Sequence, residues 1–182
     1  KVHARWYAFA LGFPALLVAV ASLGYMLAGN TLNWSLLPSR LLSYLPTLAF
    51  LAVVGGGNEE PGWRGFALGH LQSAYSPVAA TALLGSVWAL WHAPLLLANP
   101  DLLSGAMSAG AIAAVVGVTF VSIMVHAFWY TWLMNMTGSV LLCIVLHASY
   151  NTANGLLVLV PEEALTGGSY QILLVLMTTV LV

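Results

Sequence analysis

The chain has 182 residues, of which 61% are hydrophobic and 5% charged, and its formal net charge is −1. Soluble globular domains carry about 25% charged residues, so this composition excludes an ordinary soluble protein. The lack of any basic run in the sequence excludes nucleic acid as a partner. The single cysteine, Cys143, excludes an internal disulfide and is interpreted as a small packing residue.

Apolar stretches recur along the chain at about 20 residues, the length that a helix needs to cross a bilayer. We expect five spans, at residues 6–28, 40–72, 78–97, 109–133 and 139–160. Polar loops separate them at residues 29–39, 73–77, 99–101 and 135–138. A sixth run at 170–182, after a polar loop at 161–168 with Glu162 and Glu163, is too short to span as given. The sequence predicts an all-α fold, a polytopic transmembrane bundle of about six helices forming one domain over residues 1–182.

Both ends of the chain look trimmed. There is no initiator methionine, and the last apolar run stops without a polar tail, so we expect a fragment of a longer protein. Lys1 and Arg5 precede the first span, and the positive-inside rule then puts the N-terminus in the cytoplasm. Arg64 agrees with this orientation, whereas Arg40 opposes it.

Three of the charged side chains lie close together within residues 55–68, namely Glu59, Glu60 and Arg64. A carboxylate at membrane depth costs about 3 kcal/mol and usually faces a protein interior or a wet cavity. Glu60 and Arg64 are four residues apart, so a helix puts them on one face, with Glu59 turned about 100° away. We therefore interpret Glu60 and Arg64 as a structural pair and Glu59 as the carboxylate left for chemistry.

The backbone of this stretch is expected to break. Gly55, Gly56 and Gly57 weaken a helix, and Pro61 removes a hydrogen-bond donor. Broken helices at membrane depth occur where the freed backbone is buried in protein or lines a wet cavity. Taken alone, the stretch fits an active site and a polar helix-packing motif equally well.

Glu59 and His92 are expected at the same depth in the membrane, because they lie at similar distances from one turn. Counted from Tyr75 in the turn at 73–77, Glu59 lies 16 residues before and His92 lies 17 residues after. At about 1.5 Å per helical residue, both are roughly 24 to 26 Å from the turn. His92 alone would be interpreted as an interhelical hydrogen-bonding residue.

A second polar pair falls on the fifth span. Counted from Thr137, His147 and Asn151 lie 10 and 14 residues further on, roughly 15 and 21 Å from a turn on the same side. His126 lies 11 residues before Thr137 and is interpreted as a packing residue rather than a partner of His147. Together, the carboxylate, the two level histidines and the asparagine provide a general base, a proton-holding group and two oxyanion donors. That set suits attack of water on an amide.

These residues resemble the CPBP intramembrane proteases, the family of type II CAAX prenyl endopeptidases and bacteriocin-processing (Abi-type) proteins. Residues 59–64 read Glu-Glu-Pro-Gly-Trp-Arg and match the family motif Glu-Glu-x-x-x-Arg. Residues 88–92, Trp-Ala-Leu-Trp-His, resemble aromatic-x-x-x-His, with Trp where Phe is more usual. Residues 147–151, His-Ala-Ser-Tyr-Asn, resemble His-x-x-x-Asn. The three motifs occur in family order, and the resemblance covers roughly residues 41–159.

The resemblance implies a role for each motif residue. Glu59 would be the base that activates water and His92 its partner, while His147 and Asn151 would stabilise the oxyanion. Glu60 and Arg64 would support the site structurally.

The resemblance leaves the metal and the substrate open. Glu59, His92 and His147 would suffice as zinc ligands with an open fourth position, as in a metalloprotease, and would equally serve a metal-free glutamate mechanism. Asn151, one turn from His147, favours the metal-free mechanism. The expected partners are the lipid bilayer and a peptide or membrane-protein substrate, in CAAX-type or bacteriocin processing, at a bacterial cytoplasmic membrane.

Two alternatives remain from the sequence. A non-catalytic membrane protein for bacteriocin self-immunity or scaffolding would keep the fold and bind a partner. A small transporter would use the same buried charges as a proton relay.

Overall fold

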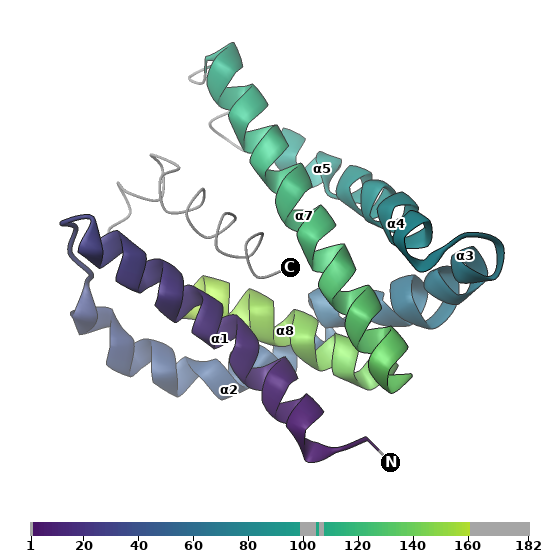
Figure 1. The fold of residues 1–182 in the computed structure, drawn as a ribbon. Coiled ribbons are helices and arrows are strands. Elements are labelled where there is room, and N and C mark those ends of the chain that lie inside the picture. The colour runs from purple at the N-terminus through teal and green to yellow at the C-terminus, as the bar shows by residue number, and fades with distance from the viewer. Residues whose placement is uncertain (1, 99–104, 106–107, 161–182) are drawn as a thin grey trace.

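The computed structural model describes residues 2–98, 105 and 108–160, and most of these residues are helical (Figure 1). The helices are α1 (Ala4–Leu27), η1 (Trp34–Leu36), α2 (Leu37–Val53), η2 (Gly56–Glu59), η3 (Pro61–Ala67), α3 (Leu68–Ala74), α4 (Pro77–Trp91), α5 (Ala93–Leu97), α7 (Ala109–Thr137) and α8 (Val140–Leu156). The described residues contain no strand, so the predicted all-α fold is confirmed. The predicted loops at 99–101 and 161–168 and the sixth run at 170–182 lie outside the described residues.

Four segments are long and apolar enough to cross a membrane. They are Ala4–Leu27, Trp34–Glu59, Pro77–Leu95 and Ala109–Thr137, and a shorter apolar helix, Val140–Leu156, follows. None of the residues of α2, which makes up most of the second segment, is buried. The chain is therefore a multi-pass membrane protein, as its composition predicts.

The short helix α8 lies at the centre of the bundle. It packs against α1 and α2 along its length and also contacts η2, η3 and α7 (Figure 1). Its buried side chains include the motif residue His147 and the nearby Ser149. The other close pair of helices is α4 with α7, where a Cβ on Gly85 would lie 2.8 Å from Met124 Sδ and 3.0 Å from Ala127 Cβ. A small residue at this crossing lets the two backbones approach closely.

The second span breaks where the sequence predicts. Helix α2 ends at Val53, the chain forms the 3₁₀ helix η2 and then the π-helix η3, and only from Leu68 does α3 resume regular α-helix. Glycine at position 57 lets the chain pass close to the end of α2, since a Cβ on Gly57 would lie 2.9 Å from the backbone of Ala52. Pro61 starts η3, where its missing N–H is tolerated. Short π-helical turns are often found at functional sites, and this one carries the Glu-Glu-x-x-x-Arg motif.

Two predicted helix boundaries were wrong. The span predicted at residues 78–97 is split, because α4 ends at Trp91 and α5 begins at Ala93. Pro94 has no N–H to continue the α-helical ladder, and His92 becomes the residue that closes α4. The span predicted to stop at residue 133 runs on to Thr137, because the helix ends only at Gly138, whose left-handed φ of 63° suits glycine.

Candidate active site

The centre of the site is a buried carboxylate that accepts hydrogen bonds from an arginine and a histidine. Glu60 is fully buried and its Oε1 accepts a hydrogen bond from Arg64 Nη1 at 3.0 Å. The same oxygen accepts a second hydrogen bond from His147 Nδ1 at 2.7 Å. The predicted pair of Glu60 and Arg64 is therefore present, and it extends across the bundle to α8. A carboxylate on Nδ1–H orients an imidazole and stabilises its charged form.

Arg64 is enclosed by aromatic rings. Its guanidinium carbon lies 4.4 Å from the ring centroid of Trp88 on α4 and 4.5 Å from that of Tyr130 on α7. Within the described part of the chain, Nε and Nη2 have no hydrogen-bond acceptor. The faces of the two rings take that place, because aromatic faces attract a cation and do so most strongly away from water.

Glu59 occupies a different environment from Glu60. Its Oε2 accepts hydrogen bonds from the indole N–H groups of Trp63, at 3.2 Å, and Trp88, at 2.9 Å. Glu59 is partly exposed, and the ion pairs among the described residues all involve Glu60 instead. The two carboxylates therefore differ as predicted, with one salt-bridged and buried and the other held only by neutral donors.

His147 and Asn151 converge beside the broken helix. A methyl group built on Gly56 would overlap His147 Nε2 and lie 2.6 Å from Asn151 Nδ2. Both nitrogens therefore approach the same point next to the backbone of η2. Only a glycine fits at position 56, because any Cβ would occupy the space of these two side chains.

The side chain of Trp88 contacts three of the predicted catalytic residues. Its ring packs edge-on against His147, with ring centroids 5.6 Å apart, and against His92, with centroids 5.5 Å apart. Its N–H holds Glu59, as described above. The carbonyl of Trp88 also accepts a hydrogen bond from His92 Nδ1 at 2.8 Å, which leaves Nε2 as the nitrogen available to a substrate or water.

The charges of this cluster are paired unequally. Glu60 is paired with Arg64 and hydrogen-bonded to His147, whereas Glu59 is held by two indole N–H groups. Buried charges are tolerated when they are paired and hydrogen-bonded, which is the arrangement found around Glu60.

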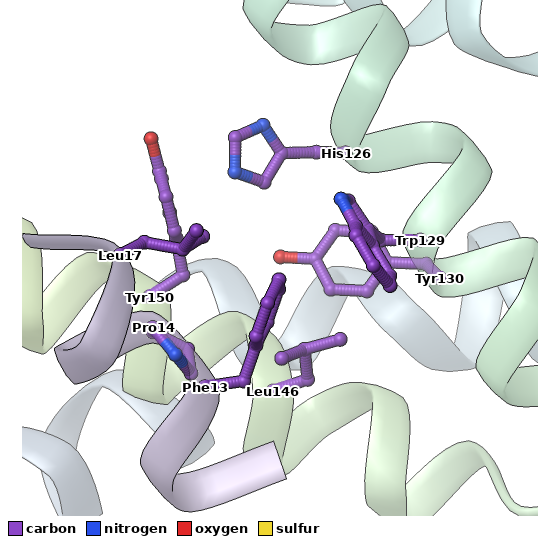
Figure 2. A pocket seen from close by; sticks show the side chains of 8 residues that line it. All are labelled: Phe13, Pro14, Leu17, His126, Trp129, Tyr130, Leu146 and Tyr150. Atoms are coloured by element: carbon purple, nitrogen blue, oxygen red, sulfur yellow. The ribbon is translucent and has the colours of Figure 1, made fainter. Parts of the chain in front are cut away.

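His126 belongs to a neighbouring pocket. Its Nδ1 donates to the carbonyl of Ser122 at 2.6 Å, and its ring packs against Tyr150 with centroids 4.0 Å apart. Tyr130 is one of the residues that line this pocket (Figure 2). Its ring also stacks on His147, with ring centroids 5.4 Å apart. None of the described residues that line this pocket is a predicted catalytic residue. The lining consists of Phe13, Pro14, Leu17, His126, Trp129, Tyr130, Leu146 and Tyr150.

Sequence reasoning missed three contributors to this site, the N–H groups of Trp63 and Trp88 and the ring of Tyr130. The sequence contained a signal for the two indole N–H groups. An indole N–H can only donate, and in a membrane bundle it needs an acceptor, so two tryptophans flanking an acidic motif were candidates. Tyr130 carried no such signal, because nothing local indicates which face of α7 meets Arg64.

The residues present do not fit the zinc site that the sequence left open. Within the described residues, no three His, Cys, Asp or Glu side chains are arranged to hold a metal ion. The hydrogen bonds of Glu59 Oε2 and His147 Nδ1 do not engage Glu59 Oε1 or His147 Nε2, so the misfit concerns the arrangement of the side chains and not occupied ligand atoms. A three-ligand zinc site would require Glu59, His92 and His147 to converge on one point, which this arrangement does not provide.

Comparison with known proteins identifies the family. Residues 41–153 match the family described as "Type II CAAX prenyl endopeptidase Rce1-like". A stretch of 56 residues is 46% identical to "CAAX prenyl protease 2" of Methanococcus maripaludis, covering 31% of this chain and 20% of that relative. The match thus spans about a fifth of the length of that curated relative. No solved structure matches the chain. Because the family match covers more than half of the sequence, including all three motifs, this chain belongs to the Rce1-like type II CAAX prenyl endopeptidase family.

Proposed function

We propose that the protein is an intramembrane endopeptidase in which Glu59 activates water. One observation carries the proposal. The ring of Trp88 contacts Glu59, His92 and His147, three of the four predicted catalytic residues, although they come from three separate helices. Asn151 joins them through its approach, with His147, to Gly56. Independent packing residues would have no reason to gather around one side chain.

The proposed reaction is addition of water to an amide carbonyl. Glu59 accepts a proton as the water oxygen bonds to the carbonyl carbon, and His92 Nε2 holds the remaining hydrogen of the water. The π electrons move to the carbonyl oxygen, which is stabilised by His147 Nε2–H and the Asn151 amide. When the C–N bond breaks, the proton on Glu59 passes to the leaving nitrogen, so that one water is consumed and an acid and an amine are formed.

Glu60 has a supporting role in this scheme. Its carboxylate accepts from His147 Nδ1–H and so directs Nε2 toward the oxyanion. With both ring nitrogens protonated, Nδ1–H donates to Glu60 and Nε2–H can donate to the oxyanion. Arg64 pairs with Glu60 and holds it in place.

The proposed substrate is a peptide that reaches the site from the membrane. The name of the relative from Methanococcus maripaludis supports a prenylated C-terminal peptide as the first substrate to test. The depth of the motif residues within apolar helices supports a lipid-borne substrate more generally.

The test is hydrolysis in proteoliposomes. Farnesylated and unmodified C-terminal peptides would be offered to wild-type protein and to Glu59→Gln. We expect cleavage by the wild type and a loss of about 10²-fold or more in the variant, since a general base contributes that much. Activity of Glu59→Gln within about threefold of wild type would exclude the proposed role.

A further inference from the structure

The indole N–H groups of Trp63 and Trp88 converge on a single oxygen of Glu59. Trp63 comes from η3, four residues along the chain, and Trp88 comes from α4, 29 residues along. The donors lie at 3.2 Å and 2.9 Å from Oε2. Two rigid donors on different helices fix the position of a carboxylate more closely than one could.

This arrangement gives the two carboxylate oxygens different tasks. Both lone pairs of Oε2 accept hydrogen bonds from the indole donors, so Oε1 is the oxygen available to accept a proton. A carboxylate in a weakly polar surround needs hydrogen-bond donors to remain charged, and Glu59 receives them from neutral groups. Neutral donors stabilise the carboxylate, whereas a neighbouring guanidinium would also repel the incoming proton.

The contrast with Glu60 supports this interpretation. Glu60 is held by Arg64 and His147, both of which can carry positive charge. Adjacent carboxylates thus receive opposite kinds of partner, cationic for the structural one and neutral for the one proposed to react. We propose that Trp63 and Trp88 are positioning residues that hold Glu59 with one oxygen aimed at the reacting water.

The proposal rests on the proposed function, and kinetics test it together with the assignment of Glu59. Trp63→Phe keeps an aromatic side chain, smaller than the indole, and removes the N–H. Because the donors act on the base and not on the bound peptide, kcat should fall about 10- to 100-fold with KM within about threefold. Trp88→Phe should show the same split. Trp34→Phe is the matched control, since Trp34 is exposed on η1, and its kinetics should equal those of the wild type.

A spectroscopic measurement tests the contacts without relying on turnover. Protein labelled with ¹⁵N-tryptophan has seven indole N–H signals, and the Phe variants assign those of Trp63 and Trp88. In Glu59→Gln, which replaces the charged acceptor by a neutral amide, we expect these two signals to shift and the other five to stay.

The outcomes separate the two proposals. If Glu59→Gln keeps its activity, the proposed function fails, whatever the indole signals do. If Glu59→Gln is inactive while both Phe variants keep wild-type kcat, or the two signals do not respond to Glu59→Gln, the positioning role is wrong. If Trp63→Phe is too unstable to assay, 3-benzothienylalanine is placed at position 63 instead. This analogue has sulfur in place of the indole N–H in a ring of the same shape, and it should give the same loss of kcat.

Discussion

Glu60 Oε1 lies 2.7 Å from His147 Nδ1, although the two residues are 87 positions apart in the chain. This hydrogen bond ties the broken helix to α8 and orients the imidazole whose other nitrogen faces Gly56. Arg64 completes the group from one turn away, and Trp88 and Tyr130 shield its guanidinium. In the proposed mechanism, the glutamate next to the base supports the site and takes no part in proton transfer.

Arg64→Ala should destabilise the folded protein as well as reduce turnover. Removing one partner of a buried ion pair strands the other charge, at a cost of about 3–5 kcal/mol. Glu59→Gln, by contrast, should leave the bundle intact and abolish turnover. Thermal unfolding in detergent measures both variants beside the wild type. If Arg64→Ala is as stable as the wild type while Glu59→Gln unfolds, the structural and chemical glutamates have been interchanged.

The double variant Glu60→Met with Arg64→Met separates stability from chemistry. Replacing both partners by apolar side chains strands no charge, so much of the stability lost in Arg64→Ala should return. Turnover should remain low, because His147 Nδ1 loses its acceptor. Unfolding temperature and peptide cleavage are measured on the same preparations. Recovery of activity together with stability would show that Glu60 does not orient His147.

Gly56→Ala should abolish most activity. The added methyl group would overlap His147 Nε2, and the ring has little freedom to move because Glu60, Trp88 and Tyr130 surround it. A displacement of about 1 Å at a reacting group can cost about 10²-fold in rate. Gly69→Ala on α3 is the matched control, since nothing lies within 4 Å of its Cβ position. Wild-type cleavage by Gly56→Ala would mean that the space between His147 and Asn151 is not used.

Asn151→Ala and Asn151→Asp should both lower kcat by about 10² to 10³-fold, because each removes an oxyanion donor. The aspartate has the same size and adds a negative charge where one develops, so it should be the worse of the two. Asn154→Ala, one turn further along α8, is the control. Steady-state kinetics with one peptide compare the three variants. Equal activity in Asn151→Ala and the control would remove Asn151 from the mechanism.

Chelator treatment should leave peptide cleavage unchanged, and purified protein should contain far less than one equivalent of zinc. The reason is that, among the described residues, no three His, Cys, Asp or Glu side chains are arranged to hold a metal ion. Elemental analysis and cleavage assays before and after dialysis against chelator provide the measurement. Loss of activity that zinc alone restores would contradict this prediction.

Local sequence was sufficient for much of the fold and for part of the site. Hydrophobic runs near the thickness of a bilayer predict the spans, since each span is a property of consecutive residues. The pair of Glu60 and Arg64 follows from helical spacing, and the break follows from the three glycines and Pro61, because these effects act within a few residues. The exact ends of α4 and α7 did not follow, since a single proline or a left-handed glycine moves a boundary by several residues.

Only the tertiary structure decided how the helices face one another. An apolar helix in a membrane carries little amphipathic signal, so its sequence does not indicate which side meets a neighbour. The contact of His147 with Glu60, the placement of Tyr130 over Arg64 and the second indole donor to Glu59 all depend on that rotation. The sequence by itself determined which polar residues had to be buried in the membrane, and packing determined which of them meet.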